Sequence, residues 1–472
     1  MNLRPTLAFA VLFAACTNEV GAPLDPFTEV GLAPGAGPST AELCANEPLV
    51  PTSAPLRRLT VEEYENSVAD LFPGVSLPAV ALIRDSRKDG FTNNVLTQGV
   101  SALSVERLEE AAMSVATAAV AEIATWASCT PEGDGSACAR HIAVEWGERA
   151  FRRPLEPEEI AELEAFVTGQ IAQAGFEDTV RMVLWSLLES PMFQYRPEVG
   201  DASRTDALGV PLNDFELATR LSFFLTRRPP DAELYAAAGR NELRSTEQIR
   251  AHTQRLLQTP AAAGTVRKFF EEWLHLDRID VLALDPVLFP EVDAQLRADL
   301  HESIQRFTEA VFWEEDDYDA LFTARFGYVN DRLAEIFGVP APGSDTLVRM
   351  DLDPTQRAGL LTQPGLLAST SHGIAHSPIM RGVVMLESIL CAPAPAPPPG
   401  ILENFEPVEV DPSEICTTRD QVAKTHTVGA SCQTCHVAID GAGFLFENFD
   451  ALGRYRTVEN GCDVDPSGEL VT

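Results

Sequence analysis

Apolar residues recur at every third or fourth position through most of the chain between residues 55 and 390, and this spacing predicts α-helices. A clear case begins behind Asn213, where we expect one buried stripe formed by Phe215, Ala218, Leu221, Phe224 and Leu225. No segment of fixed length repeats along the chain, which disfavours a solenoid. The pattern therefore predicts a mainly α protein made of consecutive helical bundle domains.

Several helix starts can be located from side chains that satisfy the free amides of a first helical turn. Three pairs have the spacing of a capping box: Thr60 with Glu63, Asn213 with Glu216, and Ser245 with Gln248. Pro157 and Pro378 stand where a first helical turn tolerates proline, because the missing amide would have no partner there.

Breaks in the pattern divide the chain into segments, and the firmest break is a proline run that cannot be helical. The resulting organisation begins with a signal peptide and anchor cysteine over 1–16 and a flexible tether over 17–55. Helical domains are expected over 56–128, 129–200 and 201–338, followed by a fourth helical segment over 339–392, a proline-rich spacer over 393–400 and a small domain over 401–472.

The charge of the chain narrows the choice of partners. Its 472 residues include 70 Asp and Glu against 35 Lys and Arg, which gives a net charge of -35. Such a charge opposes close approach to phosphate backbones and anionic lipid surfaces. We therefore expect no nucleic-acid partner.

The first sixteen residues read as an export signal. The apolar run from Leu7 to Ala15 is far shorter than the roughly 20 residues of a transmembrane helix. Small residues directly before Cys16 resemble a bacterial lipoprotein signal, in which that cysteine is lipidated, although Phe13 stands where leucine is usual. The alternative is an ordinary secretory peptide with Cys16 in a disulfide. Membrane attachment is expected only through the N-terminal lipid.

The sharpest chemical signal is the pentapeptide Cys432-Gln433-Thr434-Cys435-His436. In an exported protein, CxxCH is typical of covalent haem c attachment, with the two thiols bound to the vinyl groups and the histidine on the iron. A zinc site of Cys432, Cys435 and His436, with or without Cys462, remains open, as do a thioredoxin-like pair and a plain disulfide.

The second axial ligand of such a haem is left open by the sequence. His426 is the first choice for a distal ligand because it lies only ten residues upstream of His436. Met380 and His376 are rivals, and an open coordination site is another. The pair His372 and His376 has i, i+4 spacing, but an intervening glycine makes an ordinary polar loop the better interpretation.

Residues after the motif permit two interpretations. Apolar side chains follow His436 closely and form either a haem pocket or the plain core of a small domain: Ile439, Phe444, Leu445, Phe446 and Phe449. Charged side chains in the next stretch form either ion pairs at the haem edge or a solvated strip: Glu447, Asp450, Arg454 and Arg456. The tail from Asp463 to Gly468 begins like a calcium loop but lacks the glutamate of the twelfth position.

The cysteine count agrees with an oxidising compartment. Of nine cysteines, one is assigned to lipid and two to a cofactor, so that six remain and can form three disulfides. Nearness in sequence favours Cys129 with Cys138 around a glycine-rich turn, and the other pairings stay open.

Several long segments occur together in a recognisable order: LRRLTVEEYENSVADLF from Leu56, AFRRPLEPEEI from Ala150, LNDFELATRLSFFL from Leu212, FFEEWLHLDRI, AGLLTQPGLLA, HSPIMRG and CQTCHVAIDGAGFLFENFDALGRYR. The chain thereby resembles a family of exported planctomycete and myxobacterial proteins made of serial domains of unknown function. The resemblance implies helical domains that end in a cytochrome-c-like domain, which looks truncated here because family members continue past Gly468-Glu469-Leu470.

These observations lead to three functional hypotheses. The first is a haem protein that transfers single electrons to or from a basic redox protein. The second is a haem-dependent oxidoreductase, of peroxidase or oxygenase type, that acts on an organic or polysaccharide substrate. The third is a surface scaffold in which the motif holds a structural metal. No Walker A or GxSxG motif occurs, and spacing alone selects no catalytic residues in the helical domains.

Overall fold

The computed structural model describes residues 55–205, 209–315, 317–392, 410–411, 415–426 and 430–470, without the side chains of residues 426 and 430–435. The expected signal peptide with Cys16, nearly all of the tether and the proline-rich spacer lie outside these ranges. The described chain is mainly helical, which confirms the predicted class. It forms two compact units, an N-terminal unit over residues 49–266 and a C-terminal unit described from Arg267 onward, with the boundary inside the segment 201–338.

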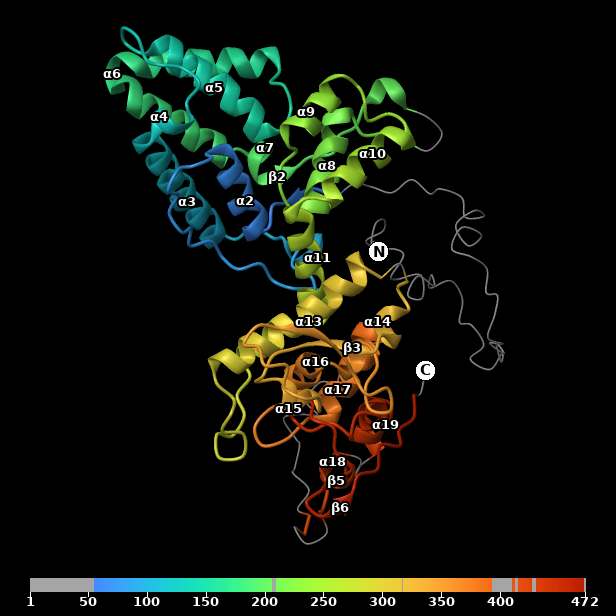
Figure 1. The fold of residues 1–472 in the computed structure, drawn as a ribbon. Coiled ribbons are helices and arrows are strands. Elements are labelled where there is room, and N and C mark those ends of the chain that lie inside the picture. Colours follow the sequence, from blue (N-terminus) through green and yellow to red (C-terminus); the bar gives the residue numbers. More distant parts are fainter. Residues whose placement is uncertain are drawn as a thin grey trace. The chain divides into compact units, whose positions relative to one another are not determined.

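The N-terminal unit is a helical assembly with one short pair of strands (Figure 1). Strand β1 (Arg57–Arg58) pairs antiparallel with β2 (Tyr195–Arg196). The helices are α2 (Val61–Leu71), η1 (Val95–Thr97), α3 (Ala102–Ala121), α4 (Ile123–Trp126), α5 (Ser136–Phe151), α6 (Pro157–Glu189), α7 (Pro191–Gln194), η2 (Ala202–Arg204), α8 (Asp214–Thr226), α9 (Ala232–Gly239), α10 (Thr246–Leu257) and the start of α11 (Pro260–Trp273).

The core of this unit lies where α3 and α5 pack along the long helix α6. Trp146 is buried there, and its ring lies edge-on to Trp126 at 4.5 Å between centroids. The spacing argument placed the helix starts correctly, because the three predicted capping boxes form at Thr60, Asn213 and Ser245. Pro157 likewise opens α6 and Pro378 opens α17 in the other unit.

The predicted apolar stripe on α8 is partly wrong. Ala218 and Leu225 are buried as expected, but Phe224 is 36% exposed and Phe223 is buried in its place. The reason is that α8 packs on two sides, since Phe223 also lies against the guanidinium of Arg196, 4.9 Å from the ring centre. A single-face pattern cannot describe a helix with two neighbours.

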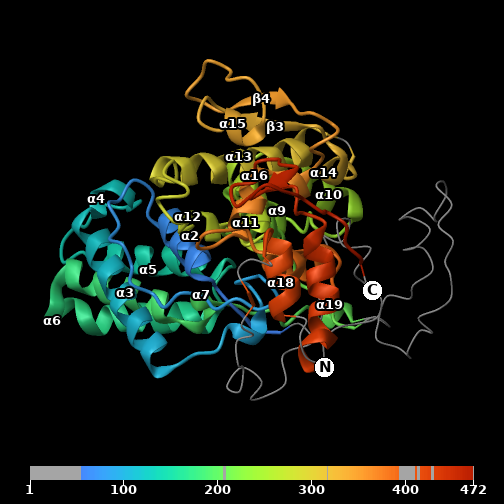
Figure 2. The ribbon, with the colours of Figure 1, turned by 90° about the horizontal axis from the view of Figure 1, so that it is seen from below.

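The C-terminal unit combines a long helix, two short antiparallel strand pairs and a terminal pair of helices. Strand β3 (Phe326–Val329) pairs antiparallel with β4 (Val348–Asp351), and β5 (Val458–Glu459) with β6 (Cys462–Asp463). After the end of α11, its helices are α12 (Asp277–Asp280), α13 (Ala294–Trp313), α14 (Ala320–Thr323), α15 (Ala334–Phe337), η3 (Leu360–Thr362), α16 (Pro364–Ser369), α17 (Pro378–Val384), the π-helical turn η4 (Met385–Ile389), α18 (Thr418–His426) and α19 (Ala430–Phe444). Figure 2 shows α18 and α19 side by side.

Helix α17 lies directly against α19, although the sequence assigns them to different segments. The contact is between backbones: a Cβ atom added at Gly382 would lie 1.9 Å from the carbonyl oxygen of Ile439. One added at Gly443 would lie 1.9 Å from the carbonyl oxygen of Pro378. Only glycine permits so close an approach at these two positions. The helix that carries the CxxCH motif is thus packed into the preceding segment.

Candidate functional site

Helix α19 begins at Ala430 and contains the whole CxxCH motif within its first two turns. On an α-helix, positions three and four apart share a face, so positions 432, 435 and 436 lie on one side of α19. The structure does not describe the side chains of Cys432, Cys435 and the distal candidate His426. The backbone therefore supplies the spacing that haem attachment requires.

His436 has a buried carboxylate as its neighbour one turn further along α19. Its Nδ1 atom lies 3.1 Å from Oδ1 of Asp440, whose side chain is 2% exposed while that of His436 is 25% exposed. An ionised carboxylate only accepts hydrogen bonds, so this contact favours the tautomer with its proton on Nδ1. Histidines that bind a metal through one ring nitrogen usually donate the other N–H to such an acceptor.

His376, the other histidine considered as a distal ligand, contacts a glutamate and an arginine instead. His376 is buried and its Nε2 lies 3.0 Å from Oε1 of Glu447, while Nη2 of Arg456 lies 3.3 Å from Nδ1. Because a guanidinium only donates, Nδ1 is the acceptor and Nε2–H donates to the carboxylate. Both ring nitrogens are engaged, so His376 is not arranged as a haem ligand here. The alternative that assigned it to the iron is not supported by this geometry.

Burial favours the neutral form of both members of this pair. Burial, assisted by the nearby guanidinium groups of Arg381 and Arg456, lowers the pKa of His376. Burial raises the pKa of Glu447 to about 7, although the same two arginines oppose the rise. The second carboxylate oxygen of Glu447, Oε2, is buried and has no hydrogen-bond partner in the described structure. The expectation of a solvated strip is therefore wrong for Glu447, because it is enclosed with His376.

Arg381 fixes the turn that follows α19. Its guanidinium donates to the carbonyl oxygens of Phe446, Phe449 and Asp450 at 2.9, 2.7 and 2.6 Å. The side chain is 3% exposed, and burial is the main cause of its lowered pKa. The arginine of the HSPIMRG segment is thus a structural clamp on the chain that leaves the motif helix.

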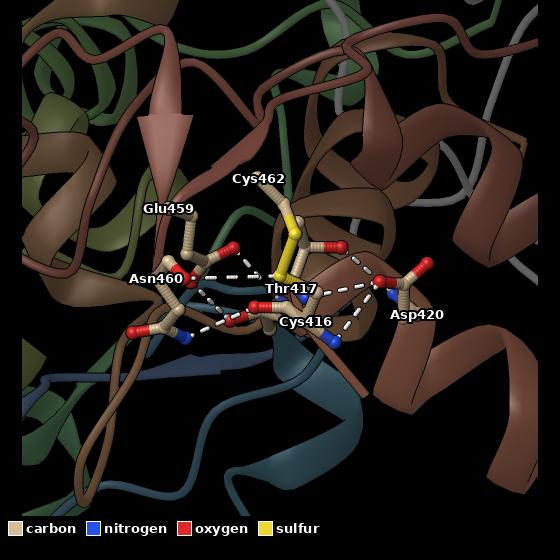
Figure 3. Close-up of a disulfide and its surroundings, with 7 residues drawn as sticks. Cys416, Thr417, Asp420, Glu459, Asn460 and Cys462 are labelled. Carbon is tan, nitrogen blue, oxygen red and sulfur yellow. Dashed lines mark hydrogen bonds between the residues drawn. A yellow bond between two sulfur atoms is a disulfide. The ribbon is translucent and has the colours of Figure 1, made fainter. Parts of the chain in front are cut away.

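A disulfide between Cys416 and Cys462 ties the start of α18 to strand β6, with 6.2 Å between the Cα atoms (Figure 3). Asp420 accepts hydrogen bonds from the backbone amides of Cys416 and Thr417, which caps α18 beside the bridge. This disulfide occupies Cys462. The alternative of a zinc site that uses Cys462 as the fourth ligand is therefore wrong.

Two further observations concern the remaining cysteines. Cys129 and Cys138 form the disulfide that their spacing favours. Cys391 is also disulfide-bonded. These bonds are typical of proteins that mature outside a reducing cytosol.

Of the apolar residues after the motif, Ile439, Phe444 and Phe449 are buried, whereas Leu445 is 38% exposed. Ile439 packs in one cluster with Leu386 and Ala442, and the ring of Phe449 lies 5.7 Å from that of Tyr455. Phe446 lines a cavity of about 20 Å³, which has room for about one water molecule. A porphyrin does not fit into that cavity. The donor set on α19 fits haem attachment, whereas this cavity does not serve as its pocket.

Other candidate metal sites find no support. Within the described ranges, no three His, Cys, Asp or Glu side chains gather as a metal site. In the tail, Asp465 accepts a hydrogen bond from the amide of Ser467 and lies 3.5 Å from Arg419, so its carboxylate has protein partners. Asp450 and Glu291 both pair with Arg454, as ordinary ion pairs. Among the residues described, no helix has both the length and the apolar character to cross a bilayer.

Comparison with known families finds four matches in series, and each is a protein family of unknown function: DUF1587 over residues 57–121, DUF1595 over 138–198, DUF1592 over 212–339 and DUF1588 over 357–459. The chain is therefore a multi-domain protein built from consecutive domains of unknown function. The DUF1588 match includes both α17 and α19. Searches of curated proteins and of solved structures each gave no match.

The sequence analysis did not predict two polar side-chain pairs of this region. Asp440 follows His436 by four positions, and helical spacing alone would have placed the two side chains together. The pair of His376 and Glu447 joins residues 71 apart in sequence, and no local pattern signals such a contact.

Proposed function

We propose that this protein is an exported c-type haem protein that transfers single electrons. The observation that carries the proposal is a CxxCH motif on a helix whose histidine has its Nδ1 against a buried carboxylate. The name of the matching family over residues 357–459, PSCyt3, agrees with a cytochrome-like domain.

In this proposal the sulfurs of Cys432 and Cys435 hold the porphyrin covalently and His436 ligates its iron. A bound haem would supply a one-electron couple between ferric and ferrous iron. His426 remains the first candidate for the distal position. The residues of the chain bind and orient the group, and the packing of α17 on α19 keeps the motif helix in place.

The proposed partner is a basic one-electron carrier protein. The reduced carrier would give up one electron and convert ferric iron to ferrous iron. Transfer in the reverse direction would reoxidise the iron and reduce the carrier again. A net charge of -35 supports attraction to a positively charged surface and disfavours anionic partners. The proposed location is outside the cytosol, with Cys16 lipidated and facing the periplasm or cell surface, and the observed disulfides are consistent with that compartment.

The test is to produce the full chain with its signal in a bacterium that expresses the cytochrome c maturation machinery. We expect one haem per chain, seen as a Soret band that survives acid-acetone extraction and as a mass gain of one haem. Replacing Cys432 and Cys435 together by alanine should abolish both signals. The matched control, replacement of Cys129 and Cys138 by alanine, removes two cysteines elsewhere and should retain them.

The outcomes separate the competing hypotheses. A colourless chain with one bound zinc ion would overturn the proposal in favour of a scaffold with a structural metal. A haem that is high-spin at rest would favour a five-coordinate oxidoreductase over an electron carrier. A low-spin spectrum in both oxidation states would support electron transfer.

A further inference from the structure

Asp440 is a carboxylate whose burial requires an explanation. Its residue exposure is 1%, and a buried ionised carboxylate is unfavourable unless hydrogen bonds and charges compensate it. The Oδ1 atom lies 3.1 Å from Nδ1 of His436, one helical turn away. An exposed i, i+4 pair would contribute only about 0.5 kcal/mol to helix stability. Burying the acidic member indicates a role that depends on its position.

The backbone around Asp440 is fixed on two sides. Ile439 lies against Gly382 of α17, where the approach leaves no space for a Cβ atom. Gly441 lies against the segment near Glu469, whose amide donates to the Gly441 carbonyl oxygen at 3.2 Å. Asp440 stands between these two contacts. Its carboxylate is therefore supported by packed backbone, which is what accurate placement of a neighbouring ligand requires.

We propose that Asp440 is a positioning residue for the proximal histidine, holding the Nδ1–H of His436 so that Nε2 is presented to the haem iron. The inference rests on the proposed function. A carboxylate acceptor increases the basicity of the imidazole, and a more basic ligand stabilises ferric iron more than ferrous iron. Asp440 thereby lowers the reduction potential of the haem.

The experiment compares Asp440→Asn with the wild-type holoprotein by spectroelectrochemical redox titration. Asparagine keeps a hydrogen-bond acceptor but removes the negative charge, so the reduction potential should shift to a more positive value. Asp440→Glu keeps the carboxylate, so its reduction potential should lie closer to the wild-type value than that of Asp440→Asn. The matched control is Asp463→Asn, which removes an exposed charge on β6 and should shift the potential much less.

The result separates this inference from the proposed function. If the wild-type chain carries no haem, the proposed function fails. If haem is attached and the reduction potentials of Asp440→Asn and Asp463→Asn are the same, the positioning role of Asp440 is refuted, but the proposal of haem binding is not. Haem content and unfolding temperature are measured for each variant, because a merely structural role would lower stability without moving the potential of the folded fraction.

Discussion

Replacing Gly382 by alanine tests the contact between α17 and α19 directly. The new Cβ atom would lie 1.9 Å from the carbonyl oxygen of Ile439 and 3.2 Å from the amide nitrogen of Gly443. Both atoms belong to the backbone, so no side chain can rotate away and the two helices must separate. Overpacking of this kind costs about 3 kcal/mol, and the better helix propensity of alanine offsets about 1 kcal/mol. We expect a net loss of about 2 kcal/mol.

Hydrogen exchange followed by mass spectrometry reads this loss in peptides that cover α17 and α19. A loss of 2 kcal/mol corresponds to exchange about 30-fold faster, because about 1.4 kcal/mol changes an equilibrium tenfold. The control is Gly264→Ala in α11, where no atom lies within 4 Å of the added Cβ and stability should be unchanged or slightly higher. Wild-type exchange in Gly382→Ala would refute the inference that these backbones touch.

Two further predictions concern the buried polar groups. Replacing Arg381 by methionine removes the donor for the carbonyl oxygens of Phe446, Phe449 and Asp450, so the free energy of unfolding should fall by about 3 kcal/mol or more in denaturant titration. Replacing Glu447 by glutamine should make the protein more sensitive to acid: folding raises the pKa of Glu447 from 4.5 to about 7, so protonation of that group adds stability as pH falls through this window. The same fall in pH destabilises the folded protein through His376, because burial lowers the pKa of its neutral ring from 6.5. Protonation of Glu447 opposes this loss of stability in the wild type but not in the glutamine variant. Relative to wild type, the glutamine variant should lose up to about 1.4 kcal/mol per pH unit between pH 7 and 4.5, and an unchanged difference across that range would contradict the assignment.

The sequence predicted local features well because their causes are local. The capping boxes at Thr60, Asn213 and Ser245 involve residues three apart, and each forms as expected. The nearby pair Cys129 and Cys138 forms its disulfide for the same reason. Helical periodicity also predicted the class correctly, because a 3.6-residue repeat requires only one apolar face.

Features that depend on the tertiary arrangement could not be predicted in the same way. The predicted burial of Phe224 on α8 is wrong because a second neighbour of the helix buries Phe223 instead. The contact of α17 with α19 depends on two glycines 61 positions apart, and glycine in a helix usually signals a weak point rather than a contact. The sequence leaves His376 as a candidate ligand for the iron, since no local pattern indicates its contacts with Glu447 and Arg456.

The glycine contact between α17 and α19 limits which fragment of the chain can fold as a separate domain. A fragment confined to residues 401–472 would expose the face of α19 that covers Gly382, together with the apolar side chains of Ile439 and Ala442. The smallest self-sufficient piece must begin upstream of the proline-rich segment, as the family match from residue 357 also does. Shuffling of this module between proteins would therefore have to carry the HSPIMRG helix with it.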